Sequence, residues 1–390
     1  MFIPVPDGRD LGETVKRLLP LLPLLLACAL ATSASRPAPP PVILISLDGL
    51  PPDYLLEADR YGLRLPNLRR LLAEGAHASA VTGVLPTVTY PSHATMVTGV
   101  SPARHRIFAN NPFDPLGRNL DGWSWYAEDL RVPALRDAAA KAGRVTASVD
   151  WPVTVGARIT HNLVQHWRTE GADAPDDAKL KRALSTPGLP AEAERLLGPY
   201  PAGEAYTLAD HRRRAAFNVY LSERKKPRLH LCYFGSLDEE EHASGPGSPE
   251  SLATLEALDA LVGEVRAAAE KAGGGRAVIA VASDHGFTRT TRELRLNEAL
   301  RAAGLILLDQ GGKVTGWKAF AWSLGALMLR DPEDAAPRGE VSGILARLVA
   351  LPDSPIQRVL TGEAIEKAEG FPGAAFVVGV KPDVRLSSRL

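Results

Sequence analysis

The chain has 390 residues, of which 45% are hydrophobic, so it can bury a large core as one big domain or as two smaller ones. This composition excludes a disordered chain. Lys and Arg together number 45, as do Asp and Glu, so the formal net charge is zero. Such a balance argues against nucleic acid or an anionic membrane surface as the main partner.

Residues 1–35 have the layout of a signal peptide. Lys16 and Arg17 precede the apolar run LLPLLPLLLACALA, which is shorter than a membrane-spanning helix and is followed by small residues. We therefore expect export to the periplasm or the extracellular space. Two outcomes stay open: cleavage after Ala31 or Ala34 would release a soluble protein, whereas lipidation of Cys28 in the lipobox-like LLAC would anchor the protein to a membrane.

Residues 36–41 are rich in proline and are expected to link this leader to a folded domain at 42–390. With Cys28 in the signal region, Cys232 is the one cysteine left in the domain, so an internal disulfide is excluded. Cys232 lies in the apolar run LHLCYF and is most simply a small core residue.

The domain alternates apolar, β-branched runs with helical patterns. The helical patterns cover 65–76, 132–143, 207–223 and 251–273, the last with a glycine stop. This alternation predicts an α/β fold with a mostly parallel central sheet and helices on both of its faces. The predicted strands, all expected to be buried and parallel, are VILISL (42–47), VTASV (145–149), LHLCYF (229–234), AVIAVA (277–282) and AAFVVGV (374–380).

Polar side chains follow three of these strands. Asp48 ends the first, Asp238 comes shortly after LHLCYF with His242 four residues later, and Asp284 and His285 follow AVIAVA. Each group alone fits turn chemistry or an acidic surface turn equally well. Together they place carboxylates and imidazoles, which suit divalent metals such as zinc, at the carboxyl edge of one sheet.

Four motifs in this order resemble those of the nucleotide pyrophosphatase/phosphodiesterase family of the alkaline phosphatase superfamily. They are SLDGLPPDYL (46–55), LPTVTYPSHATMVTGVSPARHRIFANNPFDP (85–115), YFGSLDEEEHASGP (233–246) and SDHGF (283–287). The resemblance extends from about Val42 to the C-terminus, and it implies an alkaline-phosphatase-like fold. It also implies hydrolysis of a small phosphodiester or pyrophosphate substrate, such as a nucleotide, by two divalent metal ions, with Zn²⁺ the expected ion.

The resemblance assigns the ligands residue by residue. Asp48, Asp284 and His285 would hold one ion, which would also contact a threonine nucleophile, and Asp238 and His242 would hold the other. Coordination to a cation makes the threonine alkoxide accessible at neutral pH, so no Ser-His-Asp triad is needed.

The family pattern T-F-P-N-H aligns with 89–93 and selects Thr89 over Thr87 as the nucleophile, which would form a phosphothreonine intermediate. A helix over 92–98 stopped by Gly99 would leave Thr89 just ahead of its N-terminus, where the helix dipole favours negative charge. The resemblance places the residue that stabilises the non-bridging phosphoryl oxygens and binds substrate at Asn110, with Asn111 as the fallback. It places the aromatic that flanks the substrate base at Tyr90, for which a packed core tyrosine is the alternative.

The pattern fails at one position. The family takes a third ligand for the second ion from a later GTHGY-like segment, but this sequence has no histidine after His285. Either the chain is truncated or frame-shifted before that ligand, or another residue replaces it; His161, His166 or one of Glu239, Glu240 and Glu241 are candidates. His77, His93 and His105 are expected to be structural.

Three functions follow from these expectations. The first is an exported phosphodiesterase or nucleotide pyrophosphatase. The second is a phosphomonoester or phosphonate hydrolase of the same superfamily, because pocket residues rather than metal ligands select the substrate. The third is a degenerate binding protein with poor catalysis, which the missing histidine keeps open.

Overall fold

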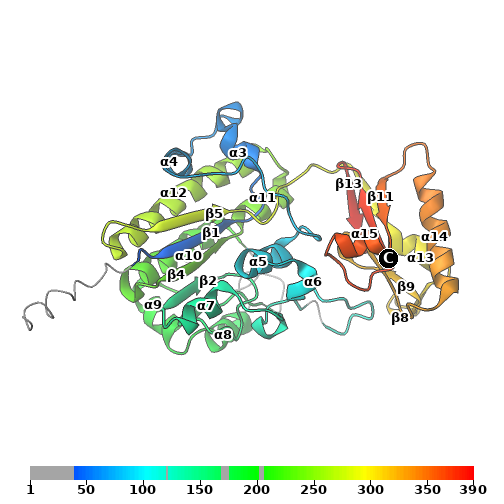
Figure 1. Cartoon of the computed structure of the whole chain (residues 1–390), viewed down its shortest axis with the longest axis horizontal. Helices are drawn as coiled ribbons and strands as arrows, with labels where there is room; N and C mark the ends of the chain where they lie inside the picture. Colours follow the sequence, from blue (N-terminus) through cyan, green and yellow to red (C-terminus); the bar gives the residue numbers. More distant parts are fainter. Residues whose placement is uncertain (1–38, 120–121, 168–174, 202–205) are drawn as a thin grey trace, which may run out of the picture. The chain divides into compact units, whose positions relative to one another are not determined.

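A computed structural model describes residues 39–119, 122–167, 175–201 and 206–390 (Figure 1). The expected signal peptide and most of the expected linker lie outside these residues. The chain divides at Pro40 and Pro41 into two units, Met1–Pro40 and Pro41–Leu390. Within the described ranges, no helix combines the length and the hydrophobicity that crossing a membrane requires.

The central sheet has five parallel strands in the order β3-β2-β4-β1-β5 (Figure 1). Four of them confirm predicted strands, whereas the short β3 was not expected. Ser46 of β1 pairs with both Tyr233 of β4 and Ala282 of β5, so these strands end at the same edge. The strands are β1 Val42–Leu47, β2 Thr146–Val149, β3 His161–Leu163, β4 Leu229–Phe234 and β5 Val278–Ala282.

Helices cover both faces of this sheet, as predicted. Alternate residues of β4 show the two faces: Leu231 packs in a core with α5, whereas Cys232 packs in a core with α12. Cys232 is fully buried, as expected. The helices of this part are α3 Pro52–Leu56, α4 Pro66–Glu74, α5 Thr89–Thr98, α6 Pro102–His105, α7 Leu135–Lys141, α8 Pro175–Leu184, α9 Leu189–Leu197, α10 Leu208–Tyr220, α11 Ser236–Ser244 and α12 Pro249–Ala272.

Short helical turns complete this part. The predicted helix at 207–223 is divided: α10 begins after its N-cap Thr207, whose side chain accepts a bond from the Asp210 amide, and a π-helical turn follows at Leu221–Lys225. Single 3₁₀ turns occupy Ala58–Tyr61 and Ala127–Asp129, and a further one, Ser323–Gly325, lies between two strands of the C-terminal sheet.

The C-terminal residues form a second, antiparallel sheet in the order β11-β12-β10-β9, with its own hydrophobic core. Two small pairs accompany it: β6 with β13, and β7 with β8. The elements are β6 Arg292–Arg295, α13 Leu296–Ala302, β7 Ile306–Leu308, β8 Val314–Trp317, β9 Ala319–Ala321, β10 Ala326–Leu329, α14 Ala335–Val349, β11 Ile356–Leu360, α15 Glu363–Lys367, β12 Phe376–Val380 and β13 Val384–Ser387.

The prediction that 374–380 is a parallel strand like the others is therefore wrong. The strand exists as β12, but it pairs antiparallel with β10 and β11. Its residues are uniformly apolar because both faces are covered: Phe376 and Val378 pack in one core and Val377 in another. Burial on two faces produces a continuous apolar run in either strand direction, so the run alone could not reveal the direction.

Candidate active site

The turns after β1 and β5 are bonded to each other at the carboxyl edge of the central sheet. The amide of Gly49 donates to Asp284 Oδ1 over 3.3 Å, and the amide of Leu50 donates to Ser283 Oγ over 2.9 Å. Gly49 has a φ of +77°, and a Cβ there would lie 3.1 Å from the Asp238 Cα. A glycine is needed because the backbones approach closely in a left-handed conformation.

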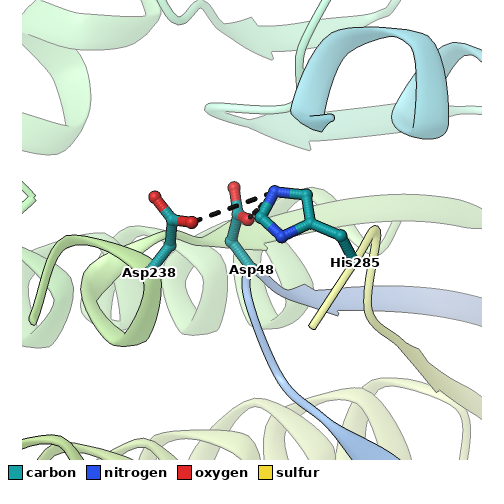
Figure 2. Close-up of side chains that lie close together, drawn as sticks. All are labelled: Asp48, Asp238 and His285. Carbon is teal, nitrogen blue, oxygen red and sulfur yellow. Dashed lines mark ion pairs between the residues drawn. The ribbon is translucent and has the colours of Figure 1, made fainter. Parts of the chain in front are cut away.

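Asp48, Asp238, Asp284 and His285 converge at this edge, as the sequence predicts. His285 Nε2 lies 3.3 Å from Asp48 Oδ1, 3.3 Å from Asp284 Oδ2 and 3.9 Å from Asp238 Oδ1. Figure 2 shows Asp48, Asp238 and His285, one ligand atom from each lying within 4.8 Å of the others. These oxygen and nitrogen donors come from three different strand ends and suit a divalent metal.

The carboxylates of this group are crowded in a dry environment. Asp48 Oδ1 and Asp284 Oδ2 are buried, and neither accepts a hydrogen bond from the part of the chain that the structure describes. Burial, reinforced by the neighbouring Asp284, raises the pKa of Asp48 well above its usual value. Burial is also the main cause that raises the pKa of Asp284 to about 7. Two adjacent carboxylates whose buried oxygens accept no hydrogen bond from the described residues fit a cation that would neutralise them.

Asp238 and His242 lie one turn apart on α11. Asp238 Oδ2 is 3.6 Å from His242 Nε2, and burial followed by the proximity of Asp48 raises the pKa of Asp238 to about 7. The His242 side chain is 69% exposed, and its ring packs edge-on against Phe287 at a centroid distance of 4.8 Å. The sequence spacing of four thus gives the expected common helix face.

The candidate replacements for a third ligand have other neighbours. Glu240 accepts a bond from the Ser244 hydroxyl over 2.5 Å, and Glu241 accepts one from Tyr54 over 3.1 Å. His161 begins β3, at the amino edge of the parallel sheet and therefore opposite the site. His166 lies on the site's side, but its ring packs against Trp125 at 4.3 Å.

Thr89 is the first residue of α5, whose N-cap is Val88. The helix begins three residues earlier than the sequence pattern predicts, and Gly99 ends it as expected with a φ of +70°. Thr89 remains at the N-terminus, where backbone amides and the helix dipole favour a negatively charged group. Thr87 instead donates from its hydroxyl to the Val84 carbonyl over 2.6 Å in an exposed loop.

Asn110 lies against the first turn of α5. Its Oδ1 accepts a hydrogen bond from the Tyr90 amide over 2.9 Å. Because an amide N–H can only donate, this bond identifies the oxygen of the Asn110 side chain and leaves its NH₂ group as the donor toward other partners. Asn111, the fallback, donates to the Gly122 carbonyl over 3.4 Å instead.

Tyr90 lies in the core, as the packed-core alternative describes. It is fully buried, its hydroxyl bonds the Gln165 amide oxygen, and its ring packs edge-on against Trp123 at 5.4 Å. A role beside a substrate base stays a prediction.

The sequence pattern assigned no site role to four residues that the structure places at the site: Ser46, His93, Tyr233 and Ser283. The Ser283 hydroxyl accepts the bond that joins the turns after β1 and β5, and Tyr233 donates to Asp48 Oδ2 over 2.6 Å. His93 was expected to be structural for want of a nearby carboxylate, yet its Nδ1 lies 3.7 Å from Asp284 Oδ2 and its Nε2 lies 2.8 Å from Ser46 Oγ. The hydrogen-bond partners of these residues lie far away in the sequence, so residue spacing could not reveal the contacts. The available signal was the alternation of side chains between the two faces of β1 and β4.

The comparison with known proteins agrees with this geometry. The family model for type I phosphodiesterase / nucleotide pyrophosphatase matches residues 42–370. The chain belongs to this family. Human ectonucleotide pyrophosphatase/phosphodiesterase family member 5 is 26% identical over 296 residues, which are 74% of this chain and 54% of that protein. An uncharacterised pyrophosphatase/phosphodiesterase of Schizosaccharomyces pombe is 28% identical over 256 residues, covering 64% of this chain and 45% of that protein. The chain thus spans about half the length of these two relatives.

Solved structures of the same fold include two with bound ligands. Murine ectonucleotide pyrophosphatase/phosphodiesterase 5, an inactive variant in complex with AMP, has a TM-score of 0.61 and 20% identity, covering 90% of this chain and 81% of that one. Phosphonoacetate hydrolase from Sinorhizobium meliloti 1021, in complex with phosphonoacetate, has a TM-score of 0.63 and 23% identity, covering 90% and 83%. These similarities confirm the predicted α/β fold of the alkaline-phosphatase type.

Proposed function

We propose that this chain is an exported, metal-dependent hydrolase of phosphodiester or pyrophosphate bonds that acts through a phosphothreonine on Thr89. One observation carries the proposal: a single side chain connects Thr89, the first residue of α5, with the expected metal ligands. Nδ1 of His93 bonds the Thr89 carbonyl oxygen and also lies 3.7 Å from Asp284 Oδ2. Asp284 and Asp48 both lie beside His285. Family membership supports the reaction class.

The side chains divide the work by position. Asp48, Asp284 and His285 would hold one divalent ion, and Asp238 with His242 the other, with Zn²⁺ as the expected ion. Such ions, when bound, supply Lewis acidity that favours the threonine alkoxide and offsets phosphoryl charge.

The reaction then proceeds in two displacements on phosphorus. Thr89 Oγ1 attacks, the bond from phosphorus to the leaving oxygen breaks, and the alcohol or nucleotide fragment departs with a proton. Water attacks the phosphothreonine in the second displacement and restores the Thr89 hydroxyl. The NH₂ group of Asn110 and the N-terminal amides of α5 would stabilise charge on the non-bridging oxygens in both displacements.

Nucleotide-like substrates and phosphonates are the two substrate classes that the comparisons favour. A solved relative contains AMP and another contains phosphonoacetate. A degenerate binding protein is the proposal of a different class, because the 69% exposed His242 is not in the group that the structure forms from Asp48, Asp238 and His285.

The experiment measures hydrolysis of bis(p-nitrophenyl) phosphate, p-nitrophenyl phosphate and phosphonoacetate by the purified protein, with and without added zinc. Zinc-dependent turnover that is faster for the diester than for the other two compounds supports the proposal. Faster turnover of p-nitrophenyl phosphate or phosphonoacetate would instead support a phosphomonoester or phosphonate hydrolase. Thr89→Ala should abolish turnover, whereas the matched Thr87→Ala should retain it. Turnover of none of the three by zinc-loaded protein would leave the binding protein.

Export is proposed from the basic, apolar and small-residue order of residues 1–35. Fractionation of cells that express the whole chain tests it. Processed protein in the soluble exported fraction supports cleavage after Ala31 or Ala34. Membrane-bound protein that Cys28→Ser releases supports the lipid anchor, and unprocessed protein in the cytoplasm contradicts both.

A further inference from the structure

His93 lies between the first turn of α5 and the two strand ends that carry the site carboxylates. It is fully buried. Its Nδ1 lies 2.7 Å from the Thr89 carbonyl oxygen, and its Nε2 lies 2.8 Å from Ser46 Oγ on β1, two residues before Asp48. One imidazole therefore connects the expected nucleophile with the strand that presents a metal ligand.

The partners of His93 define its tautomer. A carbonyl oxygen can only accept, so Nδ1 must carry the proton that is donated to Thr89. In a neutral ring Nε2 is then the acceptor, and the Ser46 hydroxyl donates to it. The distance of 3.7 Å from Nδ1 to Asp284 Oδ2 is too long for a competing hydrogen bond, so the proton remains committed to Thr89.

The surroundings prevent the ring from turning. Trp151 and Tyr233 pack edge-on against it, with centroid distances of 5.0 and 5.1 Å. Tyr233 is the same residue that donates to Asp48. A ring turned by 180° would place carbon atoms where Nδ1 and Nε2 now lie, and so leave the Thr89 carbonyl and the Ser46 hydroxyl without their ring partners.

We propose that His93 is a positioning residue, whose neutral Nδ1–H imidazole holds the Thr89 turn of α5 in register with the Asp48 carboxylate at the end of β1. It acts through its contacts with the Thr89 carbonyl and the Ser46 hydroxyl. The inference rests on the proposed function, because it assigns to Thr89 the reacting hydroxyl. A displacement of a reacting group by about 1 Å can cost roughly 100-fold in rate, so we expect loss of the contact between His93 and Thr89 to lower kcat.

Two substitutions separate the two ring contacts. In His93→Asn the side-chain amide can replace Nδ1 and still donate to the Thr89 carbonyl, whereas in His93→Gln it reaches the position of Nε2 and leaves that carbonyl without its partner. His105 is a matched control, since it is also fully buried and bonds α5 through Thr95 Oγ1 over 3.0 Å, away from the site carboxylates.

The kinetic test uses zinc-saturated protein and bis(p-nitrophenyl) phosphate. We expect His93→Gln to lower kcat by about 10- to 100-fold with KM within about 2-fold. His93→Asn should recover most of this loss, and His105→Gln should lower kcat by less than about 3-fold. Equal losses in both His93 variants, or an equal loss in His105→Gln, would overturn the proposal in favour of a purely structural histidine.

A second measurement is independent of activity and of whether a His93 variant folds. In wild-type protein with ¹⁵N-labelled histidine, one ring Nδ1–H should be protected from solvent exchange, and its ring's Nε2 resonance should shift in the mild variant Ser46→Ala. Absence of such a ring, or a protonated Nε2 in it, would overturn the proposal. If the wild-type protein hydrolysed no phosphodiester but this signal were present, the proposed function would fail while the His93 contact would stand.

Discussion

Tyr233 donates a hydrogen bond from its hydroxyl to Asp48 Oδ2 over 2.6 Å, across the neighbouring strands β4 and β1. Both side chains are buried, so the bond fixes the rotation of the carboxylate. The other oxygen, Oδ1, is consequently the one that faces His285 Nε2 at 3.3 Å. Tyr233 thus orients an expected metal ligand without being one.

The first prediction concerns Tyr233→Phe. Removing the hydroxyl frees the Asp48 carboxylate to rotate and takes away the bond to its Oδ2, so zinc affinity should fall by about 10-fold, at the low end of the usual effect of an outer hydrogen-bond partner. Competition with a zinc-chelating dye measures it. Tyr206→Phe is the matched control, because its hydroxyl bonds Gln165 instead. Unchanged affinity in Tyr233→Phe would show that the bond does not orient the ligand.

The convergence of Asp48, Asp238, Asp284 and His285 could be predicted because each of them follows a strand. Asp48 directly follows β1 and Asp284 lies two residues after the end of β5, and the carboxyl ends of parallel strands meet at one edge. The placement of Asp238 and His242 on one face of a helix followed from their spacing. These are local patterns, which a single sequence carries.

The contacts that orient these groups were not predictable in the same way. Tyr233 belongs to an apolar, buried strand and His93 to a short helix, and the partners that they bond are distant in sequence. Their roles depend on which strands become neighbours, a property of the sheet order rather than of any segment. The predicted direction of β12 was wrong for a similar reason, because the strands with which it pairs determine whether it is parallel or antiparallel.

The second prediction separates two roles of Asn110. In Asn110→Asp the carboxylate can still accept from the Tyr90 amide, so the helix start is kept, but the NH₂ donor is lost. We expect kcat for the diester to fall by about 100-fold or more, since one charge-stabilising donor contributes about 100- to 1,000-fold. The melting temperature should stay close to wild type. Asn111→Asp serves as the control, and a larger kcat loss there would move the assignment to the fallback residue.

The third prediction concerns a buried ion pair outside the site. Asp150 accepts bonds from Arg214 Nε and, over 2.8 Å, from the Tyr200 hydroxyl, and all three residues are buried. Asp150→Asn leaves the guanidinium without its countercharge and should cost about 3 to 5 kcal/mol in the free energy of unfolding. Asparagine tolerates the φ of +54° at this position, so backbone strain does not confuse the result.

Urea unfolding of Asp150→Asn measures this cost. The control is Asp176→Asn, which removes an exposed ion pair with Lys179 at 2.9 Å and should cost less than about 1 kcal/mol. Similar losses for the two variants would mean that Arg214 finds another countercharge.

The fourth prediction is a pH dependence of stability caused by Glu241. Its Oε1 accepts from the Tyr54 hydroxyl over 3.1 Å, while Oε2 is buried and accepts no bond within the described ranges. Burial is the main cause that raises the pKa of Glu241 from 4.5 to about 8, and the nearby Asp238 adds to it. The folded protein therefore holds a proton on Glu241 that the unfolded chain releases.

The sign follows from this difference. Below pH 4.5 both states are protonated, and between pH 4.5 and about 8 the folded state binds the extra proton, so the contribution of Glu241 to stability is lost as pH rises through this window. Glu241→Gln cannot ionise and should remove this loss. In chelator-treated protein, the variant should match wild type at pH 5 and be more stable at pH 8.5 by about 1 to 2 kcal/mol, the cost of one unsatisfied buried group. Glu240→Gln, on the same helix with its bond to Ser244, controls for the change in net charge. If both variants gained equally at pH 8.5, general acidity of α11 rather than burial of Glu241 would be the cause.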